Sequence, residues 1–196
     1  MKELKNGFKD DQDNSIIVGE RVDFGKSDLE FLEVGATVEI GEDTKISHCH
    51  IKLGRNAKLI VGKGCHIDGR IFVGAHSTVT IGDDFTVTGN VYLRAVEATK
   101  ITIGNDVIVA AGVTVRTNDG HTIHDLISGE RINPSKDIVV ADHVWLGDEV
   151  AVLKGVEIGE GCVVGMRSVV TKSIPANSLA VGLPAKVLKQ NITWKR

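Results

Sequence analysis

The hydrophobic residues of this chain recur with a period of six. In the C-terminal half the series reads Val140, Leu146, Val152, Ile158, Val164 and Val170. Shorter series in shifted registers precede it from Val34 onward, and the residue after each aliphatic position is usually small or polar. A helix requires a period near 3.6 and a half-buried strand a period of two, and neither describes these series. A repeat of six residues is typical of a β-helix.

In such a fold each hexapeptide forms one short strand and one turn, and three hexapeptides close a triangular coil. The aliphatic side chain points inward, and the glycine that often follows it allows a tight corner. Residues 34–175, without an irregular excursion at 116–139, number 118, which predicts between six and seven coils. With stacked strands about 4.8 Å apart, the prism would be roughly 30 Å long. We therefore predict an all-β fold, a parallel β-helix.

Three regions follow from where the period holds. Residues 1–33 keep no clear period and are predicted to form an N-terminal cap over the open end of the prism. Residues 34–175 form the β-helix domain, which carries the excursion 116–139. Residues 176–196 form a C-terminal cap and a basic tail. We expect a short helix to begin near Pro184, because proline is favoured in the first turn of a helix.

Composition supports many short strands and excludes several functions. The chain of 196 residues has 22 glycines and only 4% aromatic residues. A net charge of -3 argues against general nucleic-acid binding, and no apolar run is long enough to span a membrane. No secretory signal is apparent and the three cysteines form no CxxC pair, which indicates a cytoplasmic protein. Cys65 and Cys162 occupy small inward positions of the repeat, where packing is the expected role.

The excursion 116–139 is the strongest candidate for a functional segment. Loops of this length in compact domains are more often functional than idle. It contains His121, and an imidazole can take the proton from an alcohol near neutral pH. Asp119 or Asp125 could orient its ring, and the sequence does not choose between them. The Ser-Gly turn after Leu126 and Ile127 predicts a small hairpin folded back on the prism; His124 and His143 are expected to be structural.

The charge is unevenly distributed along the chain. Between Lys172 and Arg196 there are five basic residues and no acidic ones, a pattern that could hold a phosphorylated ligand. No nucleophile elbow, P-loop or Rossmann glycine pattern occurs in the sequence. We therefore favour a mechanism in which a group passes directly between two substrates bound in a ternary complex, without a covalent enzyme intermediate.

The motifs together resemble a known family, the hexapeptide-repeat, left-handed β-helix acyltransferases. The resemblance covers roughly residues 34–190 and is closest to bacterial capsular-polysaccharide and polysialic acid O-acetyltransferases. The segments that carry it are Asn-Asp-Gly-His at 118–121, Gly-Glu-Arg-Ile-Asn at 129–133, Asp-His-Val-Trp-Leu-Gly at 142–147, Leu-Lys-Gly-Val at 153–156, the endings 169–175 and 181–187, and Asn-Ile-Thr-Trp at 191–194.

The resemblance implies transfer of an acetyl group from acetyl-CoA to a hydroxyl of a bacterial capsular or surface polysaccharide, with sialic acid polymers among the expected acceptors. It gives His121 the role of general base. It places Trp145 in the acceptor site, where the indole helps to position the acetyl group. Acetyl-CoA would bind in a groove between the prisms of a homotrimer.

The same resemblance implies a set of residues that contact the donor. These are Asp119 and Gly120 in the loop, Gly147, Met166 and Arg167 along the pantetheine arm, Thr171 and Lys172, and Lys186 and Lys189 in the cap. The lysines would supply charge for the CoA phosphates. The oxyanion of the tetrahedral intermediate requires a donor, and either Trp145 or a backbone N–H could serve. The loop departs from its relatives at Gly120 and Thr122, next to the acceptor pocket.

Other readings of the sequence remain open. The acceptor could be a small molecule, namely a sugar, an amino sugar, serine or an antibiotic. A zinc enzyme of the carbonic-anhydrase kind would need three histidines around one metal. His48 and His66 lie 18 residues apart but occupy different repeat positions, as does His76, so we expect no metal. A structural prism without chemistry is disfavoured by the long loop and the basic cap.

Overall fold

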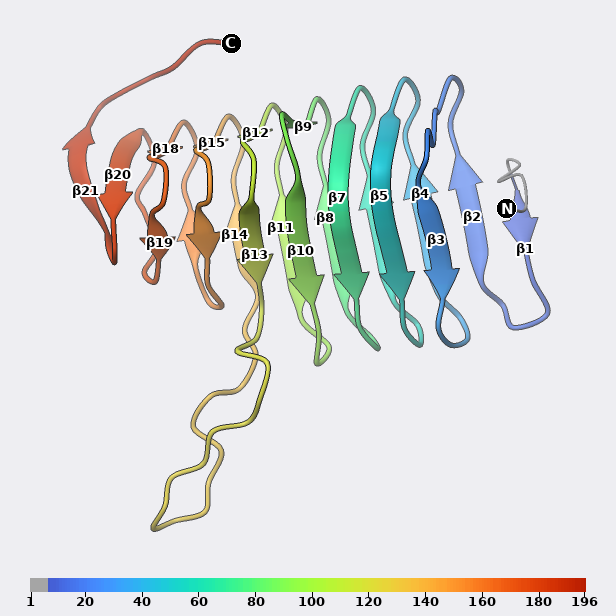
Figure 1. The fold of residues 1–196 in the computed structure, drawn as a ribbon, viewed down its shortest axis with the longest axis horizontal. Coiled ribbons are helices and arrows are strands. Elements are labelled where there is room, and N and C mark those ends of the chain that lie inside the picture. The colour runs from blue at the N-terminus through green and yellow to red at the C-terminus, as the bar shows by residue number, and fades with distance from the viewer. Residues whose placement is uncertain (1–6) are drawn as a thin grey trace.

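The computed structural model describes residues 7–196. This part of the chain contains strands and no helix, and it winds into a left-handed parallel β-helix of about seven turns (Figure 1). The all-β fold expected from the six-residue period is confirmed. No helix that could cross a membrane is present among the described residues. The chain passes in each coil along three walls, which we call A, B and C in chain order.

Wall A is a sheet of parallel strands, to which an N-terminal strand adds in antiparallel orientation. In spatial order its strands are β1 (Phe8–Lys9), β2 (Ser15–Val18), β4 (Thr37–Ile40), β6 (Lys58–Val61), β8 (Thr78–Ile81), β11 (Lys100–Ile103), β14 (Ile138–Val140) and β17 (Glu157–Ile158). Residues 1–6 of the expected N-terminal cap lie outside the described residues. The parallel stack begins at β2, which pairs with β4.

Walls B and C share two long strands that turn the corner between them, β5 (Lys45–Leu53) and β7 (His66–Val73). Wall B continues with β9 (Thr86–Val87), β12 (Ile108–Val109), β15 (Trp145–Leu146), β18 (Val163–Val164) and β20 (Ser178–Gly182). Wall C holds β3 (Asp28–Phe31), then β10 (Val91–Ala95), β13 (Val113–Arg116), β16 (Ala151–Val152) and β19 (Val169–Val170). Gly69 allows β7 to turn, since its φ is +126° and a Cβ there would lie 2.1 Å from the carbonyl oxygen of Val91.

The aliphatic positions of the repeat fill the inside of the prism. Each member of the clean series from Val140 to Val170 is at most 1% exposed, as the inward reading of the repeat predicts. Cys49, Cys65 and Cys162 are free and buried in the same core. Burial raises the pKa of the Cys49 thiol to about 12 and that of Cys65 to about 11, so neither is an activated nucleophile.

The C-terminal end differs from the sequence prediction. The short helix expected near Pro184 is wrong, because β20 and β21 (Ala185–Gln190) form an antiparallel hairpin around the cis peptide bond between Leu183 and Pro184. The last coil presents unpaired backbone groups along β18, and β20 satisfies them by pairing in parallel. Pairing with this open sheet edge stabilises the hairpin more than the preference of proline for the first turn of a helix stabilises a helix.

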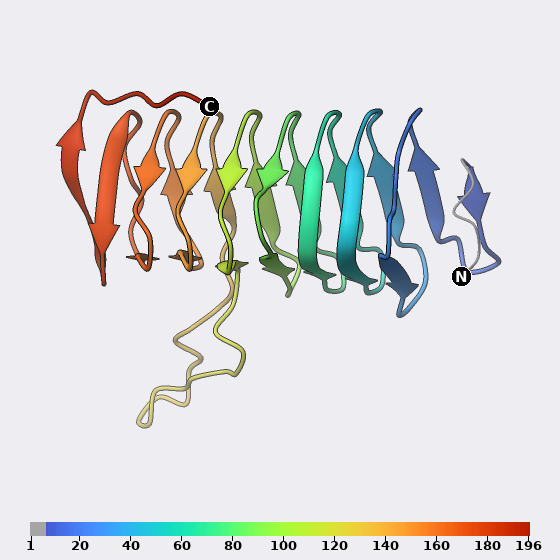
Figure 2. The ribbon, with the colours of Figure 1, turned by 45° about the horizontal axis from the view of Figure 1, so that its top comes forward.

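Residues 191–196, which we call the strap, run back from this hairpin along the corner between walls A and B (Figure 2). Trp194 is only 9% exposed. Arg196 donates hydrogen bonds to the Asp106 carboxylate at 2.6 Å and to the Asp84 carbonyl at 2.7 Å. The end of the segment expected as a basic tail is therefore attached to the prism.

Candidate functional site

The excursion leaves the prism after β13, at the corner between walls C and A, and projects well away from it (Figures 1 and 2). Its two arms are antiparallel and bridge at His124 and Arg131, so the expected hairpin is present. The tip does not fold back on the prism, because Leu126 is 99% and Ile127 97% exposed. The Asp125 carboxylate accepts the backbone N–H groups of Ile127 and Ser128, so the turn is satisfied locally.

Asn133 holds the neck of this loop. It is buried, at 7% exposure. Its side-chain oxygen accepts the N–H of Ile123 at 2.6 Å, and its Nδ2 donates to the carbonyl of His121 and to the carboxylate of Asp119, both at 2.9 Å. The Asn133 side chain thus joins the two arms of the loop next to His121, whose imidazole is the candidate base. Sequence reasoning missed this role, although Asn133 belongs to one of the motifs that carry the family resemblance.

A second anchor ties the returning arm to the prism. Arg131 donates from Nη2 to both carboxylate oxygens of Glu97, at 3.1 and 2.9 Å. The Ser135 hydroxyl donates to the same carboxylate at 2.7 Å. These hydrogen bonds, that from Ser135 first and then that from Arg131, hold the pKa of the Glu97 carboxyl below its usual range. Glu97 lies in the turn between β10 and β11, so the loop is supported from the coil before it.

The ring of His121 is exposed and makes no hydrogen bond or ion pair within residues 7–196. Asp119 pairs instead with Lys154 and Asn133, and the hydrogen bond from Lys154 is the main cause that lowers the pKa of its carboxyl. Asp125 is occupied at the tip of the hairpin. Neither of the two carboxylates considered from sequence therefore orients the His121 imidazole within one chain.

Trp145 lies in β15 on wall B, between Ile108 and Val163 of the neighbouring strands, and is 42% exposed. The strap flanks it, since the ring centroid of Trp194 is 6.3 Å away and the planes are tilted by 54°. His143 supports the strap through a 2.5 Å contact of its Nδ1 with the Asp106 carboxylate and a 3.2 Å contact of its Nε2 with the Trp194 carbonyl. Its structural role agrees with the expectation from sequence.

Within one chain the structure does not bring His121 and Trp145 together. The excursion leaves from the corner between walls C and A, whereas Trp145 faces outward from wall B, which is opposite that corner. The loop then extends away from the prism (Figure 1). An imidazole and an indole that act on one substrate would have to come from two copies of the chain.

Three of the expected donor contacts meet at the corner between walls B and C. Gly147 and Met166 lie in consecutive coils there, and a Cβ on Gly147 would lie 2.8 Å from the Met166 nitrogen. Met166 is 62% exposed, and Arg167 is held by Glu149 at 3.0 Å. Gly147 is buried, so a ligand lying along this corner would meet the exposed thioether of Met166.

The other expected donor contacts lie elsewhere on the C-terminal coils. Thr171 and Lys172 follow β19 and are exposed at the corner from which the excursion leaves. Lys186 and Lys189 are exposed on β21. Gly120 has a φ of +98° in the neck of the loop, beside Asp119. The set is therefore spread over two corners, the terminal hairpin beside wall B and the neck of the loop, and does not form one pocket in a single chain.

The histidines considered for zinc do not converge. His48 lies 3.5 Å from Asp68, whereas His66 is paired in register with Lys45. Among residues 7–196 no three His, Cys, Asp or Glu side chains are grouped as metal ligands would be.

The prism with a single anchored loop defines a hexapeptide-repeat transferase. Residues 99–116 match the family described as Hexapeptide repeat of succinyl-transferase, and residues 137–172 match Bacterial transferase hexapeptide (six repeats). The polysialic acid O-acetyltransferase of Neisseria meningitidis is 39% identical over 82% of this chain and 75% of that protein. The chain belongs to the hexapeptide-repeat acetyltransferases, the family that includes this enzyme.

Two further similarities support the assignment. The polysialic acid O-acetyltransferase of Escherichia coli O1:K1 is 36% identical over 69% of this chain, a match that spans only 44% of that protein. The crystal structure of the polySia-specific acetyltransferase NeuO superposes with a TM-score of 0.87 and 34% identity, over 93% of this chain and 85% of that one. The resemblance inferred from the motifs is confirmed.

Proposed function

We propose that this protein transfers the acetyl group of acetyl-CoA to a hydroxyl of a bacterial capsular or surface polysaccharide, with sialic acid polymers as the first acceptors to test. Two relatives with this fold are named polysialic acid O-acetyltransferases. The observation that carries the proposal is the neck of the loop, where Asn133 holds the backbone of His121 while leaving its ring exposed. An accessible imidazole on a fixed support suits a general base.

In the proposed reaction the His121 imidazole removes the proton of the acceptor hydroxyl as its oxygen attacks the thioester carbonyl. The C–S bond breaks when the tetrahedral intermediate collapses, and the proton passes from the imidazolium to the departing thiolate. The products are the acetyl ester and CoA, without a covalent enzyme intermediate. The negative oxygen of the intermediate requires a hydrogen-bond donor, for which the indole N–H of Trp145 and a backbone N–H are the candidates.

The donor site in this proposal lies on the coils after the excursion. Lys172, Lys186 and Lys189 are exposed and supply positive charge for the CoA phosphates. The corner that carries Gly147 and Met166 offers backbone groups to the amides of the pantetheine arm. Replacing Lys172 and Lys186 by alanine should weaken CoA binding in calorimetry and leave the melting temperature unchanged.

We further propose that the active form is a homotrimer, in which the loop of one copy reaches the Trp145 wall of the next. The separation of His121 and Trp145 within one chain supports this arrangement. The fully exposed Leu126 and Ile127 at the loop tip also support it, because adjacent apolar side chains in water favour a partner surface. A cyclic trimer would use the same contact three times and close on itself.

The role of His121 is tested with His121→Ala. A lost general base should lower kcat about a thousandfold, while CoA binding measured by calorimetry is retained. His124→Ala is the matched control, because that ring lies nearer the loop tip, where it bonds to the Gly129 carbonyl. Unchanged turnover in His121→Ala would overturn the assignment.

The shared site is tested by mixing two inactive proteins. His121→Ala and Trp145→Ala chains, unfolded together and refolded as mixed oligomers, should regain activity if each site takes its imidazole and its indole from different copies. Mixed oligomers without activity would place both groups in one chain. A CoA-release assay against capsular sugars, sialic acid polymers and small sugars identifies the acceptor class. We place the reaction in the cytoplasm, which the three free cysteines support.

A further inference from the structure

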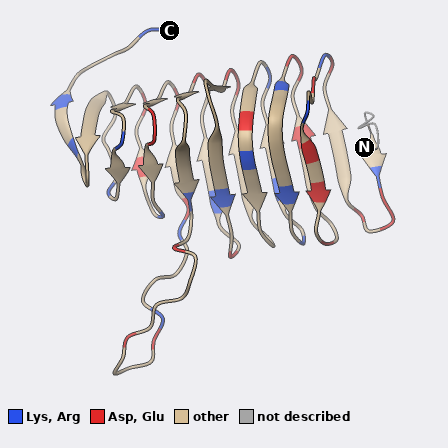
Figure 3. Ribbon diagram, viewed as in Figure 1, with Lys and Arg blue, Asp and Glu red and all other residues tan. Residues whose placement is uncertain are grey.

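Wall C carries a run of arginine and aromatic side chains in the coils before the excursion. Two outward-facing rows cross β7, β10 and β13. One row holds Arg70, Tyr92 and Thr114 in register, and the other holds Phe72, Arg94 and Arg116. Figure 3 shows the basic bands on β7 and β10 of this wall and an acidic band on β7, with β5 between β7 and the acidic bands of β3. The second row ends at β13, where the excursion begins.

The aromatic rings hold the guanidinium groups in place. The guanidinium carbon of Arg70 lies 4.8 Å from the centre of the Tyr92 ring, and that of Arg94 lies 4.5 Å from the centre of the Phe72 ring. Arg94 also donates to the Tyr92 hydroxyl at 3.3 Å. Such stacking fixes the plane of a guanidinium and leaves its N–H edges available to an oxyanion.

These arginines are the ones that form no salt bridge among the described residues. Every other arginine between residues 7 and 196 pairs with an aspartate or glutamate, namely Arg21, Arg55, Arg131, Arg167 and Arg196. Arg70, Arg94 and Arg116 make no ion pair in this part of the chain, and the Nε atoms of Arg94 and Arg116 are buried without a hydrogen-bond partner. Arg70 and Arg94 on adjacent coils thus present positive charge without a salt bridge, whereas the charge of Arg116 also acts on the nearby Asp119 carboxylate.

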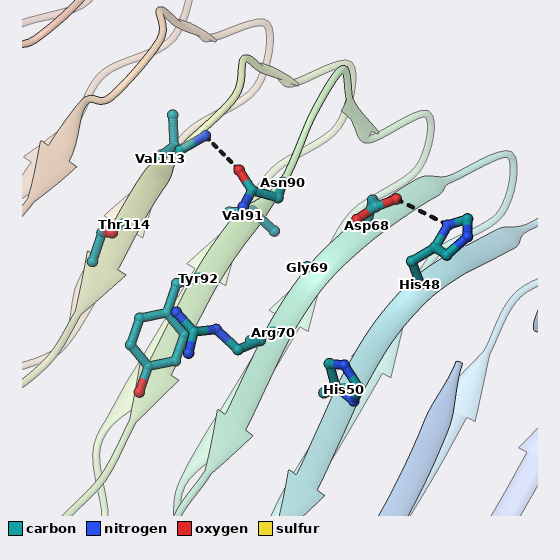
Figure 4. A pocket seen from close by; sticks show the side chains of 11 residues that line it. His48, His50, Asp68, Gly69, Arg70, Asn90, Val91, Tyr92, Val113 and Thr114 are labelled. Atoms are coloured by element: carbon teal, nitrogen blue, oxygen red, sulfur yellow. Dashed lines mark hydrogen bonds and ion pairs between the residues drawn. The ribbon is translucent and has the colours of Figure 1, made fainter. Parts of the chain in front are cut away.

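A groove of about 380 Å³ runs along the corner between walls B and C, from His48 and His50 past Arg70 to Gly112. Figure 4 shows its wall, with Arg70 beside the ring of Tyr92 and with His48 and His50 on the neighbouring strand. The one acidic side chain that lines it, Asp68, lies 3.5 Å from His48. The groove is open, and its size and polar lining suit a sugar unit.

The position of this surface relative to the proposed donor site gives it a role. Apart from Asp119 and Gly120 in the loop, the expected CoA contacts follow the excursion, whereas the arginine rows and the groove lie in the coils before it. The groove follows the same corner as Gly147 and Met166. Its end at Gly112 adjoins the next coil, where the N–H of Glu149 bonds to the carbonyl of Ala111.

We propose that Arg70, Arg94 and Arg116, with the stacked rings of Tyr92 and Phe72, bind the carboxylates of an acidic glycan chain and so align it with the reaction site. This inference rests on the proposed function, since it assigns the acceptor to the opposite side of the loop from the donor. Guanidinium groups on successive coils recognise carboxylates on successive sugar units, and a neutral glycan gains nothing from them.

The experiment measures binding without turnover. In a His121→Ala background, calorimetry gives the Kd for a long sialic acid oligomer, for the same oligomer with its carboxylates reduced to alcohols, and for CoA. Arg94→Ala or Arg70→Ala should each raise the Kd for the acidic oligomer about tenfold, the effect of one lost charge-assisted hydrogen bond. The Kd for the reduced oligomer and for CoA should not change.

Arg21→Ala is the matched control, because it removes the same charge from a side chain that pairs with Asp43 far from this wall. Arg70→Lys and Arg94→Lys keep the charge and most of the packing, and they should still weaken oligomer binding because the planar fork is lost. Equal Kd values for Arg94→Ala and Arg21→Ala would overturn the inference. Weaker CoA binding in Arg94→Ala would assign the arginines to the donor phosphates instead. If the unaltered protein bound the acidic oligomer but did not acetylate it, the proposed function would be contradicted and the assignment of the arginines would stand.

Discussion

The indole of Trp194 lies flat on the imidazole of His143, with ring centroids 4.1 Å apart and 3° between the planes. The indole N–H also donates a 2.9 Å hydrogen bond to the His143 carbonyl. These contacts attach the strap to the corner between walls A and B, and they place Trp194 beside Trp145. The exposed indole of the candidate site therefore has a neighbour that comes from the far end of the sequence.

Trp194→Ala should release the strap and leave the prism folded. The Trp145 indole then loses its neighbour, and kcat/KM with a glycan should fall about tenfold, which corresponds to about 1.4 kcal/mol of transition-state stabilisation. Limited proteolysis should cut the variant near residue 190 before any other site. Trp194→Phe keeps the stacking and is expected to behave nearly as the unaltered protein. Equal protease resistance of the two variants would contradict this account.

Asn133→Ala should damage turnover more than stability. The substitution removes every side-chain bond that joins the two arms of the loop at His121, and a misplaced base typically costs about a hundredfold in rate. The neck lies outside the prism core, so the melting temperature should change little. Ser128→Ala at the tip removes the 3.2 Å hydrogen bond from the Glu130 N–H and a hydrogen bond to the Asp125 carboxylate, away from His121, and serves as the control. A large drop in melting temperature for Asn133→Ala would show that the neck is part of the folding core.

Attachment of the strap should weaken in acid. Burial acts to raise the pKa of Asp106, but hydrogen bonds from Arg196 and His143 outweigh it, so the carboxyl has a pKa below its ordinary value. A lowered pKa means that the ionised carboxylate favours the attached strap. This contribution is complete above the ordinary carboxyl range and is lost as the pH falls below about 4. Tryptophan fluorescence should report the change, and Asp106→Asn should remove the acid-dependent step.

Phe85→Ala should strongly destabilise the prism. Phe85 is fully buried and occupies an inward position where the repeat usually has a smaller residue. Truncation of a buried phenylalanine leaves a cavity and typically costs about 3–5 kcal/mol. Denaturant unfolding measures the loss. Val34→Ala, at a residue that is 44% exposed, should cost less than about 0.5 kcal/mol.

The repeat made the prism predictable because most inward positions hold aliphatic or small side chains, with Phe85 as a larger exception. The series that ends at Val170 therefore identifies both the fold and the side chains of the core. The hairpin at Pro184 was not predictable in this way. Its structure depends on the open edge of β18, which is distant in sequence and is created only when the last coil forms.

The site was predictable only in part for a related reason. His121 stands out because it lies in a break of the period. Asn133 and Arg131 act through contacts with residues that local sequence does not connect, such as Glu97 on an earlier coil. The separation of His121 from Trp145 depends on which wall each strand joins. The six-residue period assigns each strand to a wall only when the positions at which the register shifts are known.

The register pairs that join Arg70, Tyr92 and Thr114 have a consequence for how such proteins diverge. Each coil contacts only the coils beside it, so three hexapeptides can be inserted or removed before β7 without disturbing the loop. Related proteins would then differ in the length of the surface that contacts the glycan, in steps of one coil, while the loop that carries His121 stays unchanged. The length of the chain would then set how many sugar units of the polymer the protein contacts.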